Sequence, residues 1–211
     1  MIEVKNITFM YPLSLAPILK GFTSQFERGE ITAISGKNGC GKTTLTKLLV
    51  GILRPSEGLV AIDGADTSGM TLFDIGRRAG YVFQNPSRQL FCDTAYNEVS
   101  YGLRNLGLDE IRIAQEANKY LELFDLVRHH DTYPGKLSIG EKQRLALASV
   151  FALGADYLVL DEPTTGLDAR HRQKLGELLI TLRNEHNTGI VLVSHSSDFI
   201  ASFADRELVM R

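Results

Sequence analysis

One short stretch of this chain limits its possible folds more than any other: the glycine-rich pattern G-x-x-x-x-G-K-T, which runs from Gly36 to Thr43. The apolar run at 31–35 predicts a buried strand before it, and apolar residues spaced three or four apart at 45–52 predict an amphipathic helix after it. A glycine-rich loop between a strand and a helix is typical of a phosphate-binding loop. The sequence therefore predicts an α/β P-loop fold that binds ATP.

The loop itself supplies the predicted phosphate ligands. Its glycines let backbone N–H groups approach phosphate oxygens, and the helix that follows adds the positive end of its dipole. The predicted nucleotide-binding residues of the loop are Gly36, Lys37, Asn38, Gly39, Cys40, Gly41, Lys42, Thr43 and Thr44. We expect Lys42 to hold the β- and γ-phosphates and the Thr43 hydroxyl to bind Mg²⁺. The alternatives are a turn that only caps a helix and, for Cys40, a position that tolerates many side chains.

The rest of the chain predicts strands that alternate with helices. Residues 2–9 alternate between apolar and polar, as a half-buried strand does, and 21–26 form the expected antiparallel partner. Further strands are expected at 59–63, 79–83, 157–160, 190–193 and 207–210, and a helical stretch at 94–126. This alternation predicts a mainly parallel sheet with an N-terminal antiparallel lobe. We expect a single domain over 1–211, with the α/β core at about 1–85 and 155–211 and an inserted helical lobe at about 86–154.

Polar residues follow the ends of several predicted strands. Because ligands of parallel α/β sheets bind beyond the carboxyl ends of the strands, these residues are expected to meet at one site. Asp161 is a candidate Mg²⁺ ligand, Gln84 is expected to reach Mg²⁺ or water, and Glu162 and His195 are expected to activate water and contact the γ-phosphate. The structural alternatives are a helix-start cap for the acidic pair, a solvated loop glutamine and a packing histidine.

Composition narrows the partners of the chain. With 23 basic and 25 acidic residues and a net charge of −2, it has no electrostatic footprint for nucleic acid. Two cysteines, one of them in the P-loop, favour a reducing compartment over a disulfide framework. The sequence has no apolar run of about 18 residues, so any membrane role is expected to come through a partner.

The ordered set of motifs resembles the ATP-binding-cassette (ABC) ATPases over essentially the whole chain. The set comprises Tyr11, the P-loop, Gln84, the signature-like segment Leu137–Glu141, Asp161 and Glu162, Asp168, and His195. The resemblance implies Mg-ATP hydrolysis by a dimer, in which each ATP is held by the P-loop of one subunit and the signature segment of the other. It also implies that Tyr11 stacks on adenine, although Tyr11 alone also fits a packing role. Ser138, Gly140 and Asp168 are the further nucleotide-binding residues that it implies.

The signature segment departs from the family pattern. The family usually has two glycines and a glutamine where this chain has Ile139, Gly140 and Glu141. An acidic side chain near phosphate would suit a heterodimer with one stronger and one weaker site. The spacing of Ser138 and Glu141 also fits a helix capping box, and both roles are compatible at different stages.

The segment Phe83–Leu108 resembles, more narrowly, the ATPases of energy-coupling-factor importers for vitamins, cobalt or nickel. The resemblance implies that Gln84–Leu108 contacts an integral membrane subunit and that the chain is peripheral on the cytoplasmic face of the membrane. Asp93 and Glu98 are candidate partners for basic residues there, or are solvated acids. The alternatives are an ATPase of another ABC importer or exporter and, less favoured, a soluble cassette protein or a regulatory module without turnover. Homodimer and heterodimer both stay open.

Overall fold

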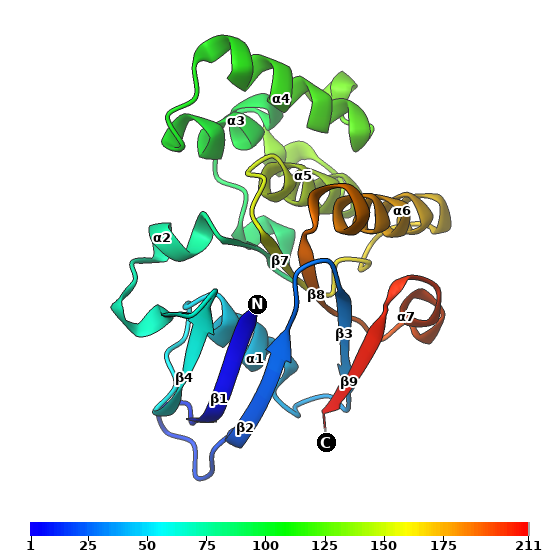
Figure 1. Ribbon diagram of the computed structural model, residues 1–211. Coiled ribbons are helices and arrows are strands. Elements are labelled where there is room, and N and C mark those ends of the chain that lie inside the picture. The colour runs from blue at the N-terminus through cyan, green and yellow to red at the C-terminus, as the bar shows by residue number, and fades with distance from the viewer. Residues whose placement is uncertain (211) are drawn as a thin grey trace. The chain divides into compact units, whose positions relative to one another are not determined.

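The computed structural model describes residues 1–210, which form two compact units (Figure 1). The first, here called the sheet unit, comprises 1–81, 155–162 and 173–210. The second, here called the helical unit, comprises 82–154 and 163–172. The segment 163–172, which the sequence analysis counted with the α/β core, is grouped here with the helical unit.

A five-stranded parallel sheet carries the nucleotide loop. Its order is β6 (Ala79–Val82), β7 (Tyr157–Asp161), β8 (Gly189–Val193), β3 (Ile31–Gly36) and β9 (Arg206–Met210). Every residue of β7 and β8 is buried, which explains why these strands appear in the sequence as unbroken apolar runs. The predicted α/β fold with a mainly parallel sheet is confirmed.

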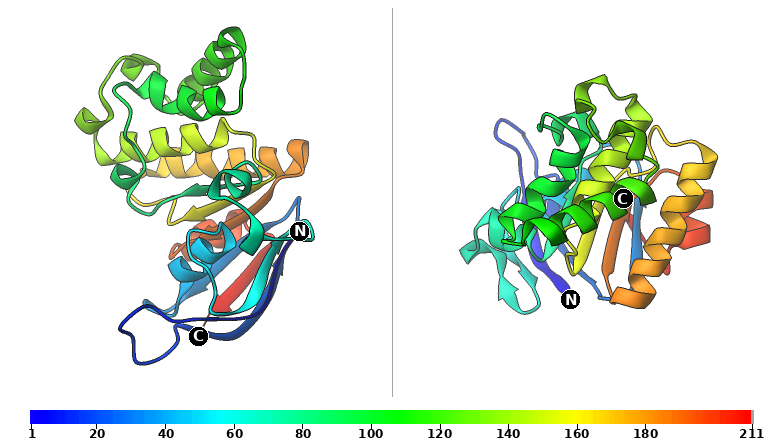
Figure 2. Two further views of the ribbon diagram at one scale, coloured as in Figure 1. Left: turned by 90° about the vertical axis from the view of Figure 1, so that its left-hand side faces the viewer. Right: turned by 90° about the horizontal axis from the view of Figure 1, so that it is seen from above.

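The N-terminal sheet is antiparallel, as expected. Its order is β2 (Leu19–Phe26), β1 (Ile2–Phe9), β4 (Glu57–Ile62) and β5 (Ala65–Asp66). The register of β1 against β2 shifts between Val4 and Ile7, around Asn6, whose φ of 50° lies in the left-handed region. The loop between β1 and β2 projects beyond the sheet in two views, at the blue end of the chain (Figure 2).

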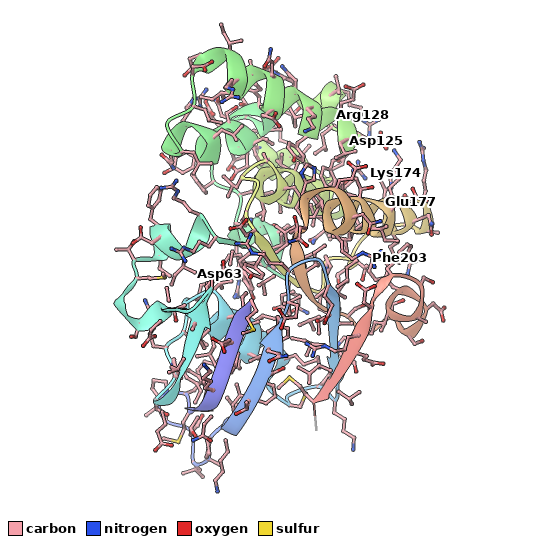
Figure 3. All side chains as sticks on the ribbon, viewed as in Figure 1. Asp63, Asp125, Arg128, Lys174, Glu177 and Phe203 are labelled. Carbon is pink, nitrogen blue, oxygen red and sulfur yellow. The ribbon has the colours of Figure 1, made fainter. Side chains whose placement is uncertain are left out.

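One carboxylate joins the two sheets of this unit. Asp63, in the turn after β4, accepts hydrogen bonds from Arg28 Nη2 at 2.8 Å and from the Tyr157 hydroxyl at 2.7 Å (Figure 3). Tyr157 begins β7 and is fully buried, so this contact ties the antiparallel sheet to the parallel one. Hydrogen bonds from Arg28, Tyr157 and the N-terminal amine lower the pKa of Asp63 far below its usual range, against the opposing effect of burial.

The helices of the sheet unit are α1 (Lys42–Leu49), α2 (Leu72–Gly76), α7 (Ser197–Phe203) and most of α6 (Ala169–His186), together with the 3-10 turn η1 (Thr67–Gly69). The sequence analysis did not predict the two short elements η1 and α2. α2 begins with a Thr71–Asp74 capping box, and it is too short to show a helical period. Gly176 of α6 lies against the Phe203 ring of α7, where a Cβ atom would come within 2.4 Å (Figure 3).

In the helical unit, three helices pack on one another. They are α3 (Ala95–Asn105), α4 (Glu110–Leu123) and α5 (Ile139–Phe151). The 3-10 turn η2 (Pro86–Arg88) precedes α3, and the turns η3 (Val127–His129) and η4 (Pro134–Lys136) lie between α4 and α5. The helical stretch predicted at 94–126 is interrupted, because Gly107 takes a φ of 77° and Asp109 caps a new helix. Within residues 1–210, the structure contains no helix of the length and apolarity that a membrane crossing requires.

Candidate nucleotide-binding site

The P-loop lies between β3 and α1, as the sequence predicts, and two of its glycines have clear steric reasons. Gly36 ends β3 with a φ of 142°, and a Cβ there would lie 2.3 Å from the Met210 carbonyl oxygen on β9. Gly41 is the N-cap of α1 with a φ of 100°. Because the cap residue provides no side-chain hydrogen bond, the N–H groups of the first helical turn stay available to an anion.

Lys42 is folded back into the loop. Its ammonium donates to the Gly36 carbonyl at 2.9 Å and to the Lys37 carbonyl at 3.0 Å, and the residue is only 7% exposed. Lys37, Asn38 and Gly39 form the exposed rim of the loop. This arrangement holds a positive charge beneath exposed backbone, which suits the binding of a polyphosphate.

The acidic residue at the end of β7 lies against the first turn of α1. The Thr43 hydroxyl donates to Asp161 Oδ1 at 3.2 Å, and Asp161 is only 2% exposed. Burial raises the pKa of Asp161 because desolvation disfavours the charged carboxylate, against the opposing hydrogen bonds from Thr43 and Tyr81 and the charges of two nearby lysines. A second contact comes from the Tyr81 hydroxyl, 3.4 Å from Oδ2, and burial together with the Asp161 charge raises the pKa of Tyr81.

The donor chemistry around Thr43 and Asp161 fits Mg²⁺, a hard cation that takes oxygen ligands. Across residues 1–210, no cluster of three or more His, Cys, Asp or Glu side chains forms a metal cage.

Glu162 and His195 meet beside this acid. His195 Nε2 lies 3.1 Å from Glu162 Oε1, and the Glu162 side chain is 9% exposed against 53% for His195. Glu162 has a φ of 55°, rare for a glutamate, and its N–H donates to the Val193 carbonyl at 3.1 Å. Burial raises the pKa of Glu162, while the nearby His195 opposes that shift. The pair therefore combines a desolvated carboxylate with a group that orients it.

Tyr11 lies beside the P-loop helix. Its hydroxyl is 3.1 Å from the Thr44 hydroxyl, and its ring packs edge-on against Phe9 with the ring centroids 4.9 Å apart. The residue stays 37% exposed. The packing role left open in the sequence is therefore present, and stacking on adenine stays a prediction.

Two predicted site residues belong to the helical unit. Asp168 accepts hydrogen bonds from the His171 N–H at 2.9 Å and from His171 Nδ1 at 2.8 Å, and the backbone bond is the main cause that lowers its pKa. Gln84 is exposed two residues beyond the end of β6. Their contacts with nucleotide or Mg²⁺ stay predictions.

The signature-like segment opens α5 with the capping box that its spacing predicts. Ser138 is the N-cap, and its hydroxyl accepts the Glu141 N–H while the Glu141 carboxylate accepts the Ser138 N–H at 2.9 Å. The Ser138 hydroxyl also lies 2.8 Å from Glu141 Oε2, to which it donates. At Gly140 a Cβ would lie 2.9 Å from the Gly166 carbonyl oxygen, whereas Ile139 is 69% exposed. The glycine is thus required at 140, and the branched residue at 139 is accommodated because it faces outward.

Two residues that the sequence analysis missed compensate the acid in this segment. Arg128 Nη2 and His129 Nε2 each lie 2.9 Å from Glu141 Oε1 (Figure 3). His129 Nε2 is also 3.0 Å from Arg128 Nε, and since one ring nitrogen cannot donate and accept at once, we assign its hydrogen to the carboxylate. The Ser138 backbone and hydroxyl bonds, together with Arg128 and His129, lower the pKa of Glu141 to about 2. Nothing in the spacing of 128, 129 and 141 along the chain signals this cluster.

The expectation that Glu98 faces a basic partner is wrong. Glu98 is only 5% exposed, and its Oε2 accepts the backbone N–H groups of Phe91 at 2.9 Å and Cys92 at 2.7 Å. The Glu98 carboxylate therefore stabilises the loop before α3 through these hydrogen bonds. Asp93 is exposed and hydrogen-bonded to Asn97, so it stays a candidate.

Comparison with known proteins places the chain among ATPases. Residues 19–165 match the family described as ABC transporter. The energy-coupling factor transporter ATP-binding protein EcfA of Methanothermobacter thermautotrophicus is 40% identical over 212 residues, covering 100% of this chain and 68% of that protein. The ABC resemblance drawn from the motifs is confirmed.

Two solved structures have the same architecture. A dimeric ATP-binding cassette in a post-hydrolysis state with ADP and phosphate superposes with a TM-score of 0.92 at 27% identity, over 100% of this chain and 94% of that one. The cbiO1 protein from Clostridium perfringens, described as part of the ABC transporter complex cbiONQ, gives 0.85 at 33% identity, over 100% and 84%. Sequence, fold and the polar residues at the strand ends agree, and the chain belongs to the ABC transporter family as an ATP-binding, ATP-hydrolysing subunit.

Proposed function

We propose that this chain is the ATPase subunit of an energy-coupling-factor type importer for a vitamin or a transition metal. The observation that carries the proposal is the 40% identity with EcfA along the whole chain. The segment Phe83–Leu108, which lies within that alignment, is the part of the sequence whose motifs resemble the subfamily. The superposition with cbiO1, from a cbiONQ complex, agrees with the same assignment.

The site residues would have separate roles in ATP binding and hydrolysis. The P-loop amides and Lys42 bind the phosphates, and Glu162 accepts a proton from water or orients it for attack. Because burial raises the pKa of Glu162, its basicity is brought closer to the working pH. His195 lies 3.1 Å from Glu162 with about half of its side chain exposed, and it would contact the γ-phosphate.

Thr43, Asp161 and Gln84 would hold Mg²⁺. When bound, the cation neutralises charge on the phosphate oxygens. Asp161 supplies a buried carboxylate whose raised pKa falls once a positive charge is next to it. Thr43 supplies a hydroxyl from the first turn of α1, already in contact with that carboxylate.

A second ABC ATPase would complete the site. In this arrangement Ser138, Gly140 and Asp168 meet the ATP held by the partner, and Ser138 turns its hydroxyl from Glu141 toward the γ-phosphate. Arg128 and His129 leave the segment without net negative charge, which removes the electrostatic objection to Glu141 near phosphate. This removes one reason to favour a weak site, and a homodimer or a heterodimer both fit.

The membrane subunit would dock through Gln84–Leu108, on the cytoplasmic face of the membrane. Phe91 and Tyr101 form an exposed edge-on pair in this segment, with centroids 4.9 Å apart and exposures of 66% and 48%. An exposed aromatic pair is typical of a protein contact surface. Asp93 adds an exposed negative charge beside it.

The test is a mild-detergent pull-down of the chain from its native membranes, with the partners identified by mass spectrometry. We expect a multispanning subunit, a second cassette ATPase and small membrane-embedded binding proteins. The double variant Phe91→Ser and Tyr101→Ser is expected to lose the multispanning subunit. The matched control Ile111→Ser, at a residue 73% exposed outside this segment, is expected to keep it.

The possible results of this pull-down test the type of transporter and the transport assignment separately. A multispanning subunit without small binding proteins would leave an ABC transporter of another type. Recovery of soluble partners alone would overturn the transport assignment and leave the ATPase chemistry standing.

The hydrolytic role has its own test. Glu162→Gln keeps the size of the side chain and removes its basicity, so we expect ATP binding to persist while turnover falls by roughly 10²- to 10⁴-fold. Phosphate release and equilibrium binding of ATP measure the two effects separately. Turnover like that of the unaltered chain would contradict the role of Glu162.

A further inference from the structure

A chain of hydroxyl groups supports the carboxylate at the end of β7. The Tyr81 hydroxyl, on β6, lies 3.4 Å from Asp161 Oδ2 and 3.2 Å from the Thr46 hydroxyl on α1. Thr46 in turn donates to the Thr43 carbonyl at 2.9 Å, and the Thr43 hydroxyl donates to Asp161 Oδ1. These contacts join Tyr81, Thr46, Thr43 and Asp161 in a ring that passes through the Thr43 backbone carbonyl. The ring includes Thr43 and Asp161, two residues proposed to hold Mg²⁺. None of the functional roles assigned above uses Tyr81 or Thr46.

The hydrogen count in this ring fixes the directions of two bonds. Asp161 as a carboxylate only accepts, so the hydrogens come from Thr43, Thr46 and Tyr81. The Thr46 hydrogen goes to the Thr43 carbonyl, and the Thr43 hydrogen goes to Asp161. Among the contacts of this ring, the Tyr81 hydrogen has two acceptors to choose between, Asp161 Oδ2 and Thr46 Oγ1.

The distances leave the ring room to tighten. Hydroxyl bonds to oxygen are most often about 2.7–2.8 Å long, whereas the two Tyr81 contacts measure 3.4 and 3.2 Å. Thr46 is fully buried and Tyr81 packs against the hydrophobic core, so the ring itself is held in place. The Tyr81 hydroxyl can therefore come closer to Asp161 Oδ2 when the carboxylate binds a cation, which would strengthen their hydrogen bond.

We propose that Tyr81 is a positioning residue for the metal site: its hydroxyl donates to Asp161 Oδ2 and holds that carboxylate toward Thr43, where Mg²⁺ would bind. This inference rests on the Mg²⁺ site proposed above. Tyr81 acts through Asp161 and does not touch the nucleotide or the cation. Its effect is therefore expected on the dependence of ATP binding on Mg²⁺ and not on the binding of ATP alone.

The experiment uses the full chain with Glu162→Gln, so that ATP is not consumed. Calorimetry gives the dissociation constant of ATP in EDTA and in saturating Mg²⁺, and their ratio is the gain from Mg²⁺. Tyr81→Phe keeps the aromatic ring and removes only the hydroxyl. In this variant we expect the dissociation constant of ATP in EDTA to stay unchanged. The gain from Mg²⁺ is expected to fall by roughly 10-fold, the effect of one hydrogen bond to a charged group. Thr46→Val removes the competing acceptor and leaves the Tyr81 hydrogen to Asp161, so it is expected to keep the gain from Mg²⁺. The double variant is expected to behave like Tyr81→Phe.

The matched control is Tyr120→Phe, at a buried tyrosine on α4 in the helical unit. It is expected to leave both constants unchanged. A full gain from Mg²⁺ in Tyr81→Phe would overturn the positioning role while the Mg²⁺ site stands. No gain from Mg²⁺ in the parent would instead overturn the Mg²⁺ site, and the role of Tyr81 with it.

Discussion

The cluster around Glu141 allows a prediction whose size follows from the structure. A pKa lowered from 4.5 to about 2 means that folding favours the ionised carboxylate, by about 3 kcal/mol at roughly 1.4 kcal/mol per pKa unit. The Arg128 side chain is 74% exposed and its share is screened by water, so about 2 kcal/mol is the expected loss for Glu141→Ala. Glu141→Gln keeps an acceptor for the Ser138 N–H and is expected to lose about 1 kcal/mol.

Urea and thermal unfolding at pH 7 measure these losses. For a chain of this length, each kcal/mol corresponds to roughly 2–4 °C in Tm, so we expect about 4–8 °C for Glu141→Ala and about half of that for Glu141→Gln. Arg128→Gln is expected to cost less than about 1 kcal/mol because its ion pair is exposed. Glu122→Gln, at an exposed glutamate on α4, is the matched control and is expected to change Tm little.

The sign of the pH dependence gives a second check. Because the pKa of Glu141 is lowered in the folded protein, its stabilisation is fully present above about 4.5 and is lost as the pH falls through about 2. The gap in stability between the unaltered chain and Glu141→Gln should therefore narrow over that range. A gap that stays constant from pH 7 to pH 2, or equal Tm values for Glu141→Ala and the Glu122→Gln control, would refute the reasoning.

Two further predictions concern the loop and the signature segment. ATP is expected to slow the alkylation of Cys40 several-fold, as measured by mass spectrometry. Cys92, whose pKa burial raises to about 11, serves as the internal reference. Equal alkylation rates of Cys40 with and without ATP would contradict the prediction. Gly140→Ala is expected to cost about 1–3 kcal/mol, because the new Cβ lies 2.9 Å from the Gly166 carbonyl oxygen. The control Gly69→Ala, where a Cβ meets nothing within 4 Å, should unfold like the parent in urea, and an equally stable Gly140→Ala would count against the contact.

The elements that sequence predicts well are those whose own residues carry the signal. The P-loop, β7 and β8 combine apolar runs with fixed polar residues at their ends, so their type and order follow directly. The capping box at Ser138 and Glu141 is a local pattern too, and the structure contains it.

The elements that sequence misses depend on tertiary contacts. Arg128 and His129 meet Glu141 only because α4, η3 and α5 pack together, and no periodicity records that meeting. Glu98 shows the reverse case: its position on a predicted helix suggested a solvated acid, but two backbone N–H groups of the preceding loop take up its carboxylate. The break at Gly107 depends on a left-handed glycine whose effect a helical pattern across 94–126 conceals.

Because Glu162 has a left-handed backbone conformation, selection for thermal stability and selection for ATPase turnover favour different residues at this position. A non-glycine residue at a φ of 55° carries a conformational cost of about 1 kcal/mol or more, which glycine would relieve. A variant library ranked only by resistance to heat would therefore be enriched in chains that have lost the carboxylate that we propose acts in hydrolysis. Engineering that aims to stabilise this protein therefore needs an ATPase screen in addition to a thermal screen. At position 162 the two screens are expected to rank variants in opposite order.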